Sequence, residues 1–468
     1  MFIVRPLFYL KEKKMASANV KNTLTSLANA QTFQGAPAEI PQDAYKRLLR
    51  QACNCMLFEN TYYQHGTEIA NEIRDTALEL PTYQITEAAM HITEHFKLRS
   101  VSVYLLALAI VKRDLNKDRV DGGIIEDAAK KILSRPDMLT ELFVLYQKLT
   151  GGDKTFPKVL HRIASERMKF YTVYQIGKYA SRGGLTLRDV LRIAHVKPQT
   201  PEREQTFKAI VNQTLEVPAT WEKRLSAGED KKTTWETMLR EGTIGGLAVL
   251  KNLRNMIAVN VDPQLIRQTL AHVELFRGAL ITQILAANIH SKNMFSTELS
   301  RLFQFINIKP LNGKTVFLVD VSGSMDNNLA NNSELTLMQA SSVLAAVGSG
   351  VCEDSQVYSF SASLLRVPYT SAYPFTFADE ICKSQSHYGT NLESALKELN
   401  TTTEYDRLII LTDEQTSSPI PAALNNKCYI INVAAYKQGI QTQLRYHRID
   451  GFSPSIFQFI NEKENIND

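Results

Sequence analysis

The length of 468 residues exceeds one ordinary core and predicts two to four domains. The composition, 44% hydrophobic and 22% charged, is that of a globular protein with a large core. The net charge of +5 hides an asymmetry, because residues 1–312 carry 43 Lys and Arg against 31 Asp and Glu, whereas residues 313–468 carry 10 against 17. The net charges of +12 and −7 indicate that only the first part is suited to a polyanion.

Membrane-spanning and disulfide-stapled proteins are excluded by further features. No apolar run approaches the roughly 20 residues that a membrane helix needs. The five cysteines are scattered, and the pair in "ACNCM", Cys53 and Cys55, has no second pair to complete a zinc site. We therefore expect reduced thiols, a cytoplasmic location and no membrane partner. Residues 1–20 lack the basic region and cleavage site of a signal peptide and are predicted to form an N-terminal extension.

From about residue 40 to residue 308, within a predicted helical domain over residues 21–308, the sequence shows helical periodicity almost throughout. Segments such as "SVSVYLLALAIVKR" (100–113), "DMLTELFVLYQKL" (137–149) and "GLAVLKNLRNMIAV" (246–259) place apolar residues three and four positions apart. The breaks between such segments are short and turn-like, and the longest is expected at "KPQTP" (197–201). Many helices joined by short loops are typical of stacked helical pairs, so we predict a HEAT-like helical repeat, although no clean sequence period is visible.

The pattern changes after "IKPLNGK" (308–314). The β-branched run "TVFLVDV" is typical of a strand that is buried on both faces, and "ELTLMQASSVLAAVGSG" behind it is helical. Strand, helix, strand and strand then follow in "SQVYSFS", "TNLESALKELN", "DRLIILTD" and "KCYIINVAAY", before a closing helix in "SIFQFINEKEN". This alternation predicts a doubly wound α/β domain over residues 313–468.

Three loops of the predicted α/β domain carry oxygen ligands at one edge of the sheet. Ligand sites of open parallel sheets lie beyond the carboxyl ends of the strands. Two carboxylates, three hydroxyls and water form an octahedral shell that suits Mg²⁺ better than Ca²⁺. Each loop alone is explained as a helix cap or a turn, but the three together predict a Mg²⁺ site. The candidate ligands are Asp320, Ser322, Ser324, Thr390 and Asp413.

This set resembles the metal-ion-dependent adhesion site of von Willebrand factor A domains, which is Asp-x-Ser-x-Ser with a distant Thr and Asp. The resemblance implies that the five candidate residues coordinate the metal ion. It also implies that a carboxylate of a partner takes the open metal position. Asp326 and Glu414 lie outside the pattern, and we expect them to face solvent or to cap helices.

A basic segment of the helical part, residues 177–204, contains candidate contacts for RNA. On the helix predicted from Thr186, Arg188, Arg192 and His195 lie four and three residues apart, on one face. Such a cationic stripe suits RNA phosphates. A solvated charged face with a satisfied histidine explains the same residues, and composition alone favours that explanation. The candidate RNA-binding residues are Lys178, Arg182, Arg188, Arg192 and His195.

The order of these motifs resembles the Ro ribonucleoprotein family, which joins a TROVE module to an A domain. The similar segments are "LRDVLRIAHVKP", "TTWETMLREG" and "GLAVLKNLRNM", followed by "DVSGSM", and the resemblance extends from about residue 20 onward. It implies a monomeric ring of HEAT-like repeats of the compact bacterial type, closed with help from the A domain. It also implies that small noncoding Y-like RNA binds the outer basic surface and that single-stranded 3′ ends of misfolded RNA bind the central hole. The implied role is RNA quality control, with an exoribonuclease tethered through the Y RNA.

Carried over by position, the RNA-contacting residues of the family fall on Lys178, Arg182 and His195. A further basic position of the animal proteins is Ala180 in this chain, a departure that bears on the register of Y RNA binding.

Two other functions remain open from the sequence. One is a protein-adhesion scaffold that works through the A-domain Mg²⁺ site without RNA, and the charge of +12 on the helical part weighs against it. The other is a metal-dependent hydrolase, for which no carboxylate pair, Ser/His/Asp set or His-rich ligand set is visible. We therefore predict a noncatalytic RNA-binding protein with a helical domain over residues 21–308 and an A domain over residues 313–468.

Overall fold

The computed structural model describes residues 38–465 except for several short segments. The segments left out are residues 40–42, 54–56, 58–64, 118–121, 153–154, 180–183, 217–219, 306–309, 331–332, 370–372, 435–438, 441–445 and 452–454. The predicted N-terminal extension and Arg182 therefore lie outside the described residues. Two compact units divide the chain: the first holds the described residues of 41–58 and 67–219, and the second those of 20–40, 59–66 and 220–468.

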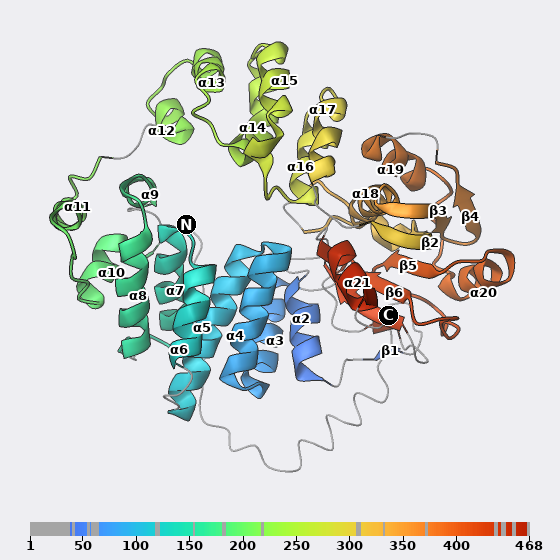
Figure 1. The fold of residues 1–468 in the computed structure, drawn as a ribbon, viewed down its shortest axis with the longest axis horizontal. Helices are drawn as coiled ribbons and strands as arrows, with labels where there is room; N and C mark the ends of the chain where they lie inside the picture. Colours follow the sequence, from blue (N-terminus) through green and yellow to red (C-terminus); the bar gives the residue numbers. More distant parts are fainter. Residues whose placement is uncertain are drawn as a thin grey trace. The chain divides into compact units, whose positions relative to one another are not determined.

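Helices stacked in two layers form the first unit (Figure 1). In one layer α4 packs on α6 and α6 on α8, while in the other α5 packs on α7 and α7 on α9. The helices of this unit are α2 (Ala44–Cys53), α3 (Gly66–Glu79), α4 (Thr82–His91), the π-helical η1 (Ile92–Phe96), α5 (Arg99–Asn116), α6 (Gly122–Ile132), α7 (Pro136–Leu149), α8 (Lys158–Phe170), α9 (Val173–Tyr179), α10 (Leu187–Ile193) and α11 (Pro201–Asn212).

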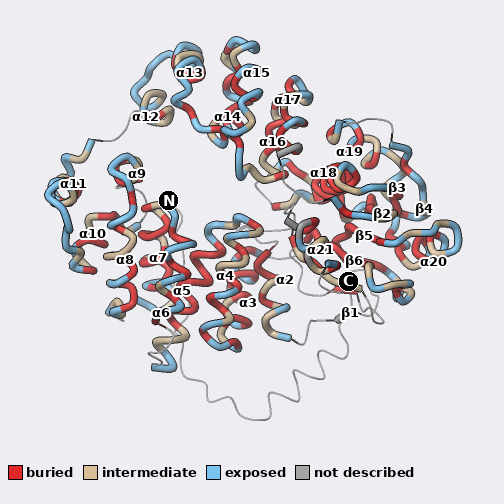
Figure 2. The backbone as a smooth tube through the Cα atoms, in the orientation of Figure 1, coloured by how far each residue is buried: buried red, intermediate tan, exposed pale blue. Residues whose placement is uncertain are grey.

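The helix α5 illustrates why this unit folds as a stack. Every residue from Val101 to Val111 is buried, because α4, α6 and α7 all pack against α5 (Figure 2). A helix that is apolar on all sides requires neighbours on all sides. Its buried hydroxyl groups have acceptors, since Tyr104 donates to the carbonyl of Ala70 at 3.0 Å. Burial of each Leu or Ile side chain in this row stabilises the unit by about 1.5–3 kcal/mol.

The second unit combines further helices with a sheet. Its helices are α12 (Trp221–Ser226), α13 (Lys231–Arg240), α14 (Gly246–Ala258), α15 (Pro263–Ala271), η2 (Val273–Phe276), α16 (Ile281–His290), α17 (Ser296–Arg301), η3 (Leu302–Phe305), η4 (Gly323–Asp326), α18 (Leu337–Ser349), α19 (Pro374–Cys382), α20 (Leu392–Thr402) and α21 (Ser455–Asn465). Its strands are β1 (Ala38–Glu39), β2 (Leu311–Asp320), β3 (Cys352–Phe360), β4 (Leu364–Val367), β5 (Arg407–Thr412), β6 (Cys428–Asn432), β7 (Gly439–Ile440) and β8 (Tyr446–Asp450).

The main sheet has six strands in the order β4-β3-β2-β5-β6-β8, and only β4 runs antiparallel to its neighbour. Alternate residues of β2 point to opposite faces. Phe317 and Val319 join the core that contains α18 and α21, whereas Val316 and Leu318 join the core that contains α20. Helices therefore cover both faces of the sheet, as predicted for a doubly wound domain. A separate two-stranded sheet pairs β1 with β7 in antiparallel orientation.

The helical stack of the second unit continues into the α/β part. The helix α16 packs on both α14 and α18, and α17 packs on both α15 and α19. This packing explains why residues 220–308 group with the α/β part and not with the earlier helices. Among the described residues, no helix combines the length and the apolar character needed to cross a membrane.

Candidate metal centre and nucleic-acid interface

The candidate metal ligands lie at the carboxyl ends of two adjacent parallel strands. Asp320 is the last residue of β2, and Asp413 follows the last residue of β5. The strand β2 lies between β3 and β5, so the chain order reverses direction at β2. A crevice at such a switch point is where open α/β sheets bind their ligands.

Asp320 is fully buried, and its two carboxylate oxygens accept different hydrogen bonds. The N–H of Ser322 donates to Oδ1 at 3.0 Å, and the hydroxyl of Thr412 donates to Oδ2 at 2.6 Å. The hydroxyl oxygens of Ser322 and Ser324 are 3.3 Å apart. The motif Asp-x-Ser-x-Ser thus folds back on itself at the end of β2, with η4 beginning directly after Ser322.

Asp413 is fully buried as well, and its charge acts on Asp320. Burial, together with the negative charge of Asp413, raises the pKa of Asp320 well above the ordinary value of an aspartate. The backbone holds Asp413 in place, because the N–H of Gln415 donates to Asp413 Oδ1 at 3.0 Å. The two buried carboxylates at this edge of the sheet, Asp320 and Asp413, therefore repel each other.

Thr390 reaches the same edge on a loop that is anchored to the end of β3. The hydroxyl of Ser361 donates to the carbonyls of Ser386 and Tyr388, at 2.9 and 2.7 Å. The N–H of Asn391 donates in turn to the carbonyl of Ser361 at 2.9 Å. The loop also passes close to η4, since a Cβ atom at Gly323 would lie 3.0 Å from the carbonyl oxygen of His387. Ser361 carries no motif signal, so sequence analysis did not identify its anchoring role.

This donor set fits a hard divalent cation. A bound cation would offset the burial and the repulsion from Asp413 that together raise the pKa of Asp320, and it would leave both carboxylates charged. No group of three or more His, Cys, Asp and Glu side chains that could hold a metal occurs in the described part of the chain. Hydroxyl groups would therefore have to complete the shell, and Ser322, Ser324 and Thr390 are present for that role.

The two acidic residues outside the pattern have different environments. Asp326 is exposed, as expected, and its Oδ2 lies 2.8 Å from Nδ1 of His387. The expectation that Glu414 faces solvent or caps a helix is wrong, because its side chain is fully buried. Its Oε2 accepts the N–H of Ile440 at 2.9 Å and lies 3.6 Å from Nε of Arg448, so β7 and β8 cover it.

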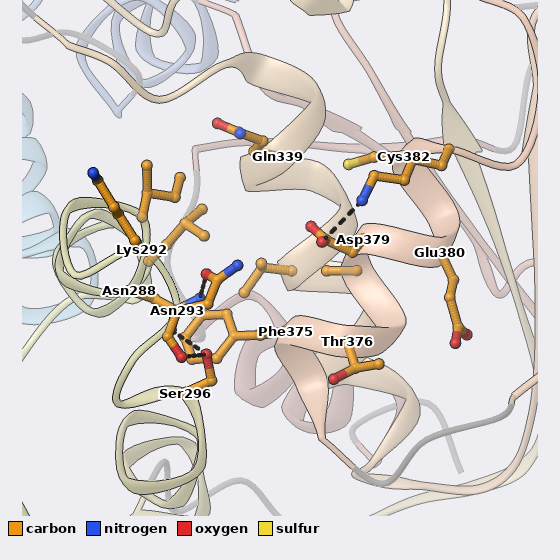
Figure 3. Close-up of a pocket in the computed structure, with 15 residues that line it drawn as sticks. Asn288, Lys292, Asn293, Ser296, Gln339, Phe375, Thr376, Asp379, Glu380 and Cys382 are labelled. Atoms are coloured by element: carbon orange, nitrogen blue, oxygen red, sulfur yellow. Dashed lines mark hydrogen bonds and ion pairs between the residues drawn. The ribbon is translucent and has the colours of Figure 1, made fainter.

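A cavity of about 740 Å³ lies elsewhere in the second unit, between α16, α17, α18 and α19 (Figure 3). Asn288 donates to Asn293 at 2.8 Å and accepts from the hydroxyl of Ser296 at 2.7 Å on one wall. Phe375 and Asp379 line it from α19. None of the five candidate metal ligands lines this cavity, so it is separate from the metal site.

The candidate RNA-binding residues lie at the C-terminal end of the first unit. Lys178 is in the last turn of α9, half-buried, with its ammonium nitrogen 5.7 Å from the ring centroid of Tyr179. Arg188 and Arg192 are both on α10, four residues apart. Arg192 is exposed, whereas Arg188 is half-buried, and its Nε has no hydrogen-bond partner among the described residues. Arg182 lies outside the described residues.

The prediction that His195 shares a helix face with Arg188 and Arg192 is wrong, because α10 ends at Ile193. His195 has a φ of +48°, in the left-handed region. The N–H of Val196 donates to the carbonyl of Leu191 at 3.1 Å, and the N–H of His195 points to the carbonyl of Arg192 at 3.4 Å. These two bonds form a Schellman motif, which ends the helix. His195 is exposed in the following turn, with its ring centroid 6.5 Å from that of His161.

Positive charge is concentrated around these residues. Between residues 158 and 197 the chain has nine Lys and Arg and two Asp and Glu. Both acidic residues are engaged locally: Glu166 pairs with Lys169, and Asp189 accepts the N–H of Thr186 at 2.9 Å in a capping box. Hydrogen bonds from Thr186 lower the pKa of Asp189 and keep it charged. Arg162 is paired with Glu126 outside the stretch, at 2.6 Å, and the remaining positive charge favours an anionic partner.

Comparison with known proteins adds two findings. The family model for the TROVE domain matches residues 212–277, which include the segments "TTWETMLREG" and "GLAVLKNLRNM" but not the basic segment 177–204. The fold is similar to the crystal structure of the Ro protein (RSR) of Deinococcus radiodurans, with a TM-score of 0.60 and 16% sequence identity. This similarity covers 90% of the present chain and 100% of the other. No curated protein matches the sequence. The chain therefore resembles TROVE domains over residues 212–277 and shares the overall fold of that Ro protein.

Proposed function

We propose that the protein binds RNA through a basic surface on the first unit, formed by Lys178, Arg182, Arg188, Arg192 and His195. The observation that carries this proposal is the net charge of +7 between residues 158 and 197, where both carboxylates already have partners. Phosphate contacts from Arg and Lys supply most of the affinity for nucleic acid. The similarity to TROVE domains and to the fold of a Ro protein supports the same partner.

The finer role follows from the family resemblance. Small noncoding Y-like RNA would bind the basic surface, and single-stranded 3′ ends of misfolded RNA would bind the central hole of a monomeric HEAT-like ring. The protein would act in RNA quality control in the cytoplasm, or as a scaffold that tethers an exoribonuclease through the Y RNA. In this role the protein is noncatalytic: it would hold RNA and present it to a separate enzyme.

The α/β part would contribute a Mg²⁺ site of the von Willebrand factor A type. Asp320, Ser322, Ser324, Thr390 and Asp413 would hold the ion, and a carboxylate of a partner would take the open position. The supporting observation is the pair of buried carboxylates at the ends of β2 and β5, whose repulsion a cation would offset. A protein-adhesion scaffold without RNA is the alternative that this site supports.

The RNA proposal is tested by salt-dependent binding. Lys178→Ala with Arg192→Ala should lower the affinity for a structured small RNA about tenfold or more and should reduce the slope of log K against log salt by about two, one for each lost phosphate contact. Lys397→Ala on α20, an exposed lysine of the acidic part, is the control and should change neither. If the double variant matches wild type at every salt concentration, RNA does not bind this surface.

The metal proposal is tested by titration calorimetry with Mg²⁺. Asp320→Ala should abolish the heat of Mg²⁺ binding, because the variant lacks a direct ligand. Asp326→Ala is the matched control, since this neighbouring carboxylate is exposed and outside the ligand set. RNA affinity of the Asp320→Ala variant should stay near that of wild type. Equal Mg²⁺ binding by wild type and Asp320→Ala would reject the site.

A further inference from the structure

A small cavity in the first unit has an unusually cationic lining. It has a volume of about 100 Å³ and lies between the end of α8, the segment after α10 and the start of α11. Lys169, Lys197 and Arg203 line it, and no Asp or Glu is among its described lining residues, although Lys169 is paired with Glu166 beside the cavity. The volume is far below the roughly 300–1,000 Å³ of pockets that enclose a whole small molecule. A single small anion is the class of ligand that suits this size and charge.

The guanidinium of Arg203 supports a ligand in this cavity. Its Nη2 donates to the carbonyl of Lys169 at 3.0 Å, which fixes the side chain against the end of α8. Its Nη1 is buried and has no hydrogen-bond partner among the described residues. Buried donors nearly always have an acceptor in native proteins, and a phosphate oxygen would provide one. Thr200, which also lines the cavity, caps the start of α11 by accepting the N–H of Arg203.

Two exposed aromatic side chains follow the lining residue Lys169 in the chain. Phe170 follows Lys169 directly and is 63% exposed, and Tyr174 on α9 is 57% exposed. Val173 beside them is 54% exposed. The guanidinium carbon of Arg167 lies 5.5 Å from the ring centroid of Phe170, so the ring has a cation at one side. Large apolar side chains that remain exposed within a cationic surface are a platform on which unpaired bases stack.

We infer that the cavity holds one phosphate of a single-stranded RNA segment and that Phe170 and Tyr174 stack the unpaired bases beside it. This inference rests on the proposed RNA binding and adds that this site prefers single-stranded RNA to duplex RNA. Bases inside a duplex are already stacked on one another and cannot reach the two rings. Tyr174 lies one helical turn before Lys178, so the stacked bases would continue into the basic surface.

The test compares a labelled oligouridylate of about 12 nucleotides, within the roughly 4–16 nucleotides typical of single-strand sites, with a duplex RNA of equal length. Binding is followed by fluorescence anisotropy at several salt concentrations. Phe170→Ala with Tyr174→Ala should lower single-strand affinity about tenfold, with the salt slope and the duplex affinity unchanged. Phe170→Tyr with Tyr174→Phe keeps both rings and should restore binding.

The phosphate cavity is tested with Arg203→Gln and with Lys197→Gln. Each should lower single-strand affinity and reduce its salt slope by about one. Lys208→Gln, an exposed lysine of α11 paired with Glu204, should leave the slope as in wild type. Because Arg203 also bonds the carbonyl of Lys169, its variant is compared with Lys197→Gln, which removes a charge from an exposed side chain.

The outcomes separate this inference from the proposed function. If wild type binds RNA and Lys178→Ala with Arg192→Ala weakens it, while the aromatic and cavity variants behave as Lys208→Gln does, the strand-specific site is wrong and RNA binding stands. Equal losses of duplex and single-strand affinity in the aromatic variant would also overturn the inference. If wild type binds neither probe, both proposals fail.

Discussion

The two candidate sites differ in how their side chains are held. Asp320, Ser322 and Asp413 are fully buried, and hydrogen bonds from neighbouring strands and turns fix the two carboxylates. Arg192 and His195 are exposed, on a helix of seven residues and the turn after it. Burial makes each polar group depend on its partners, so the two carboxylates of the candidate metal site are held in one geometry. The basic surface is defined mainly by its charge.

Ion pairs of the two units show the same contrast. Arg407 on β5 is buried, and its Nε donates to Glu464 of α21 at 2.7 Å, while its Nη1 donates to the hydroxyl of Thr315 at 2.8 Å. The pair of Lys131 and Glu94 in the first unit is 2.9 Å long, but the two side chains are 60% and 47% exposed. Exposed pairs contribute little because water and salt screen them.

The largest expected effect is the loss of the buried pair. Glu464→Gln should lower the free energy of unfolding by about 3 kcal/mol, because the buried charge of Arg407 would lose its counter-charge. The value of about 3 kcal/mol is the lower end of the range for buried ion pairs. We choose it because Glu464 also contacts Lys427, whose side chain is 40% exposed, so the site is partly open to solvent. Glu94→Gln is the matched control in the first unit and should leave stability nearly unchanged. Urea unfolding of both variants measures the difference, and similar losses would break the contrast.

The same pair predicts a pH dependence. Burial alone would raise the pKa of Glu464, but hydrogen bonds from Arg407 and Tyr429 and the charge of Arg407 outweigh it, so the pKa lies below the ordinary 4.5. A lowered pKa means that the unfolded chain binds the proton more readily than the folded one. The contribution of Glu464 is therefore complete above pH 4.5 and is lost as the pH falls through the lowered value. Wild type should lose more stability than Glu464→Gln on acidification, and parallel pH curves would contradict this.

The next effect concerns two helical glycines, one in each unit. A Cβ atom at Gly348 of α18 would lie 2.5 Å from Phe457 and 2.7 Å from Phe317, so Gly348→Ala should cost about 1–3 kcal/mol through overpacking. Gly123 of α6 has nothing within 4 Å of its added Cβ. Gly123→Ala should therefore stabilise the protein by about 0.5–1 kcal/mol, because alanine favours the helix. If thermal unfolding showed that both variants raise, or both lower, the melting temperature, the packing described for α18 would be contradicted.

The smallest effect is on the cap of α10. Thr186→Ala removes the hydroxyl that accepts the N–H of Asp189 at 3.3 Å and should cost about 1 kcal/mol. RNA affinity should fall about two- to threefold, because frayed residues Arg188 and Arg192 must be ordered again on binding. Thr220→Ala removes the cap of α12 in the second unit and is the control. RNA affinity is measured for both variants. If Thr186→Ala binds RNA as tightly as wild type and Thr220→Ala do, RNA binding does not depend on the stability of α10.

The α/β part was the more predictable region. The β-branched run around Phe317 predicted a strand buried on both faces, and Asp320 was predicted at its end, as the structure has it. Alternation of strands and helices is a local pattern that determines which strand ends meet. The edge strands β4 and β8 and the helix α19 were not predicted, because their short segments show weak periodicity. The metal ligands themselves stay a prediction.

The helical region was predicted in kind but not in detail. Long apolar faces such as that of α5 predicted helices, whereas α9, α11, α12, α16 and α17 were missed. The end of α10 was misplaced because a histidine, and not a glycine, occupies the left-handed position at residue 195. The apolar residues Leu191 and Val196, which pair in Schellman motifs, were the available signal. Arg203 and Phe170 were missed because their roles depend on a cavity that only the fold assembles.

The continuation of the helical stack into α18 and α19 gives the α/β part a second role, that of a capping repeat. A helical solenoid needs its last repeat covered, since an open end exposes apolar side chains. The pair α18 and α19 covers α16 and α17 in this way. A fragment that stops at residue 308 would expose Leu285 and Phe303, which are buried in the shared core. Solubility of the helices from residue 220 onward is therefore tied to the sheet domain that follows them.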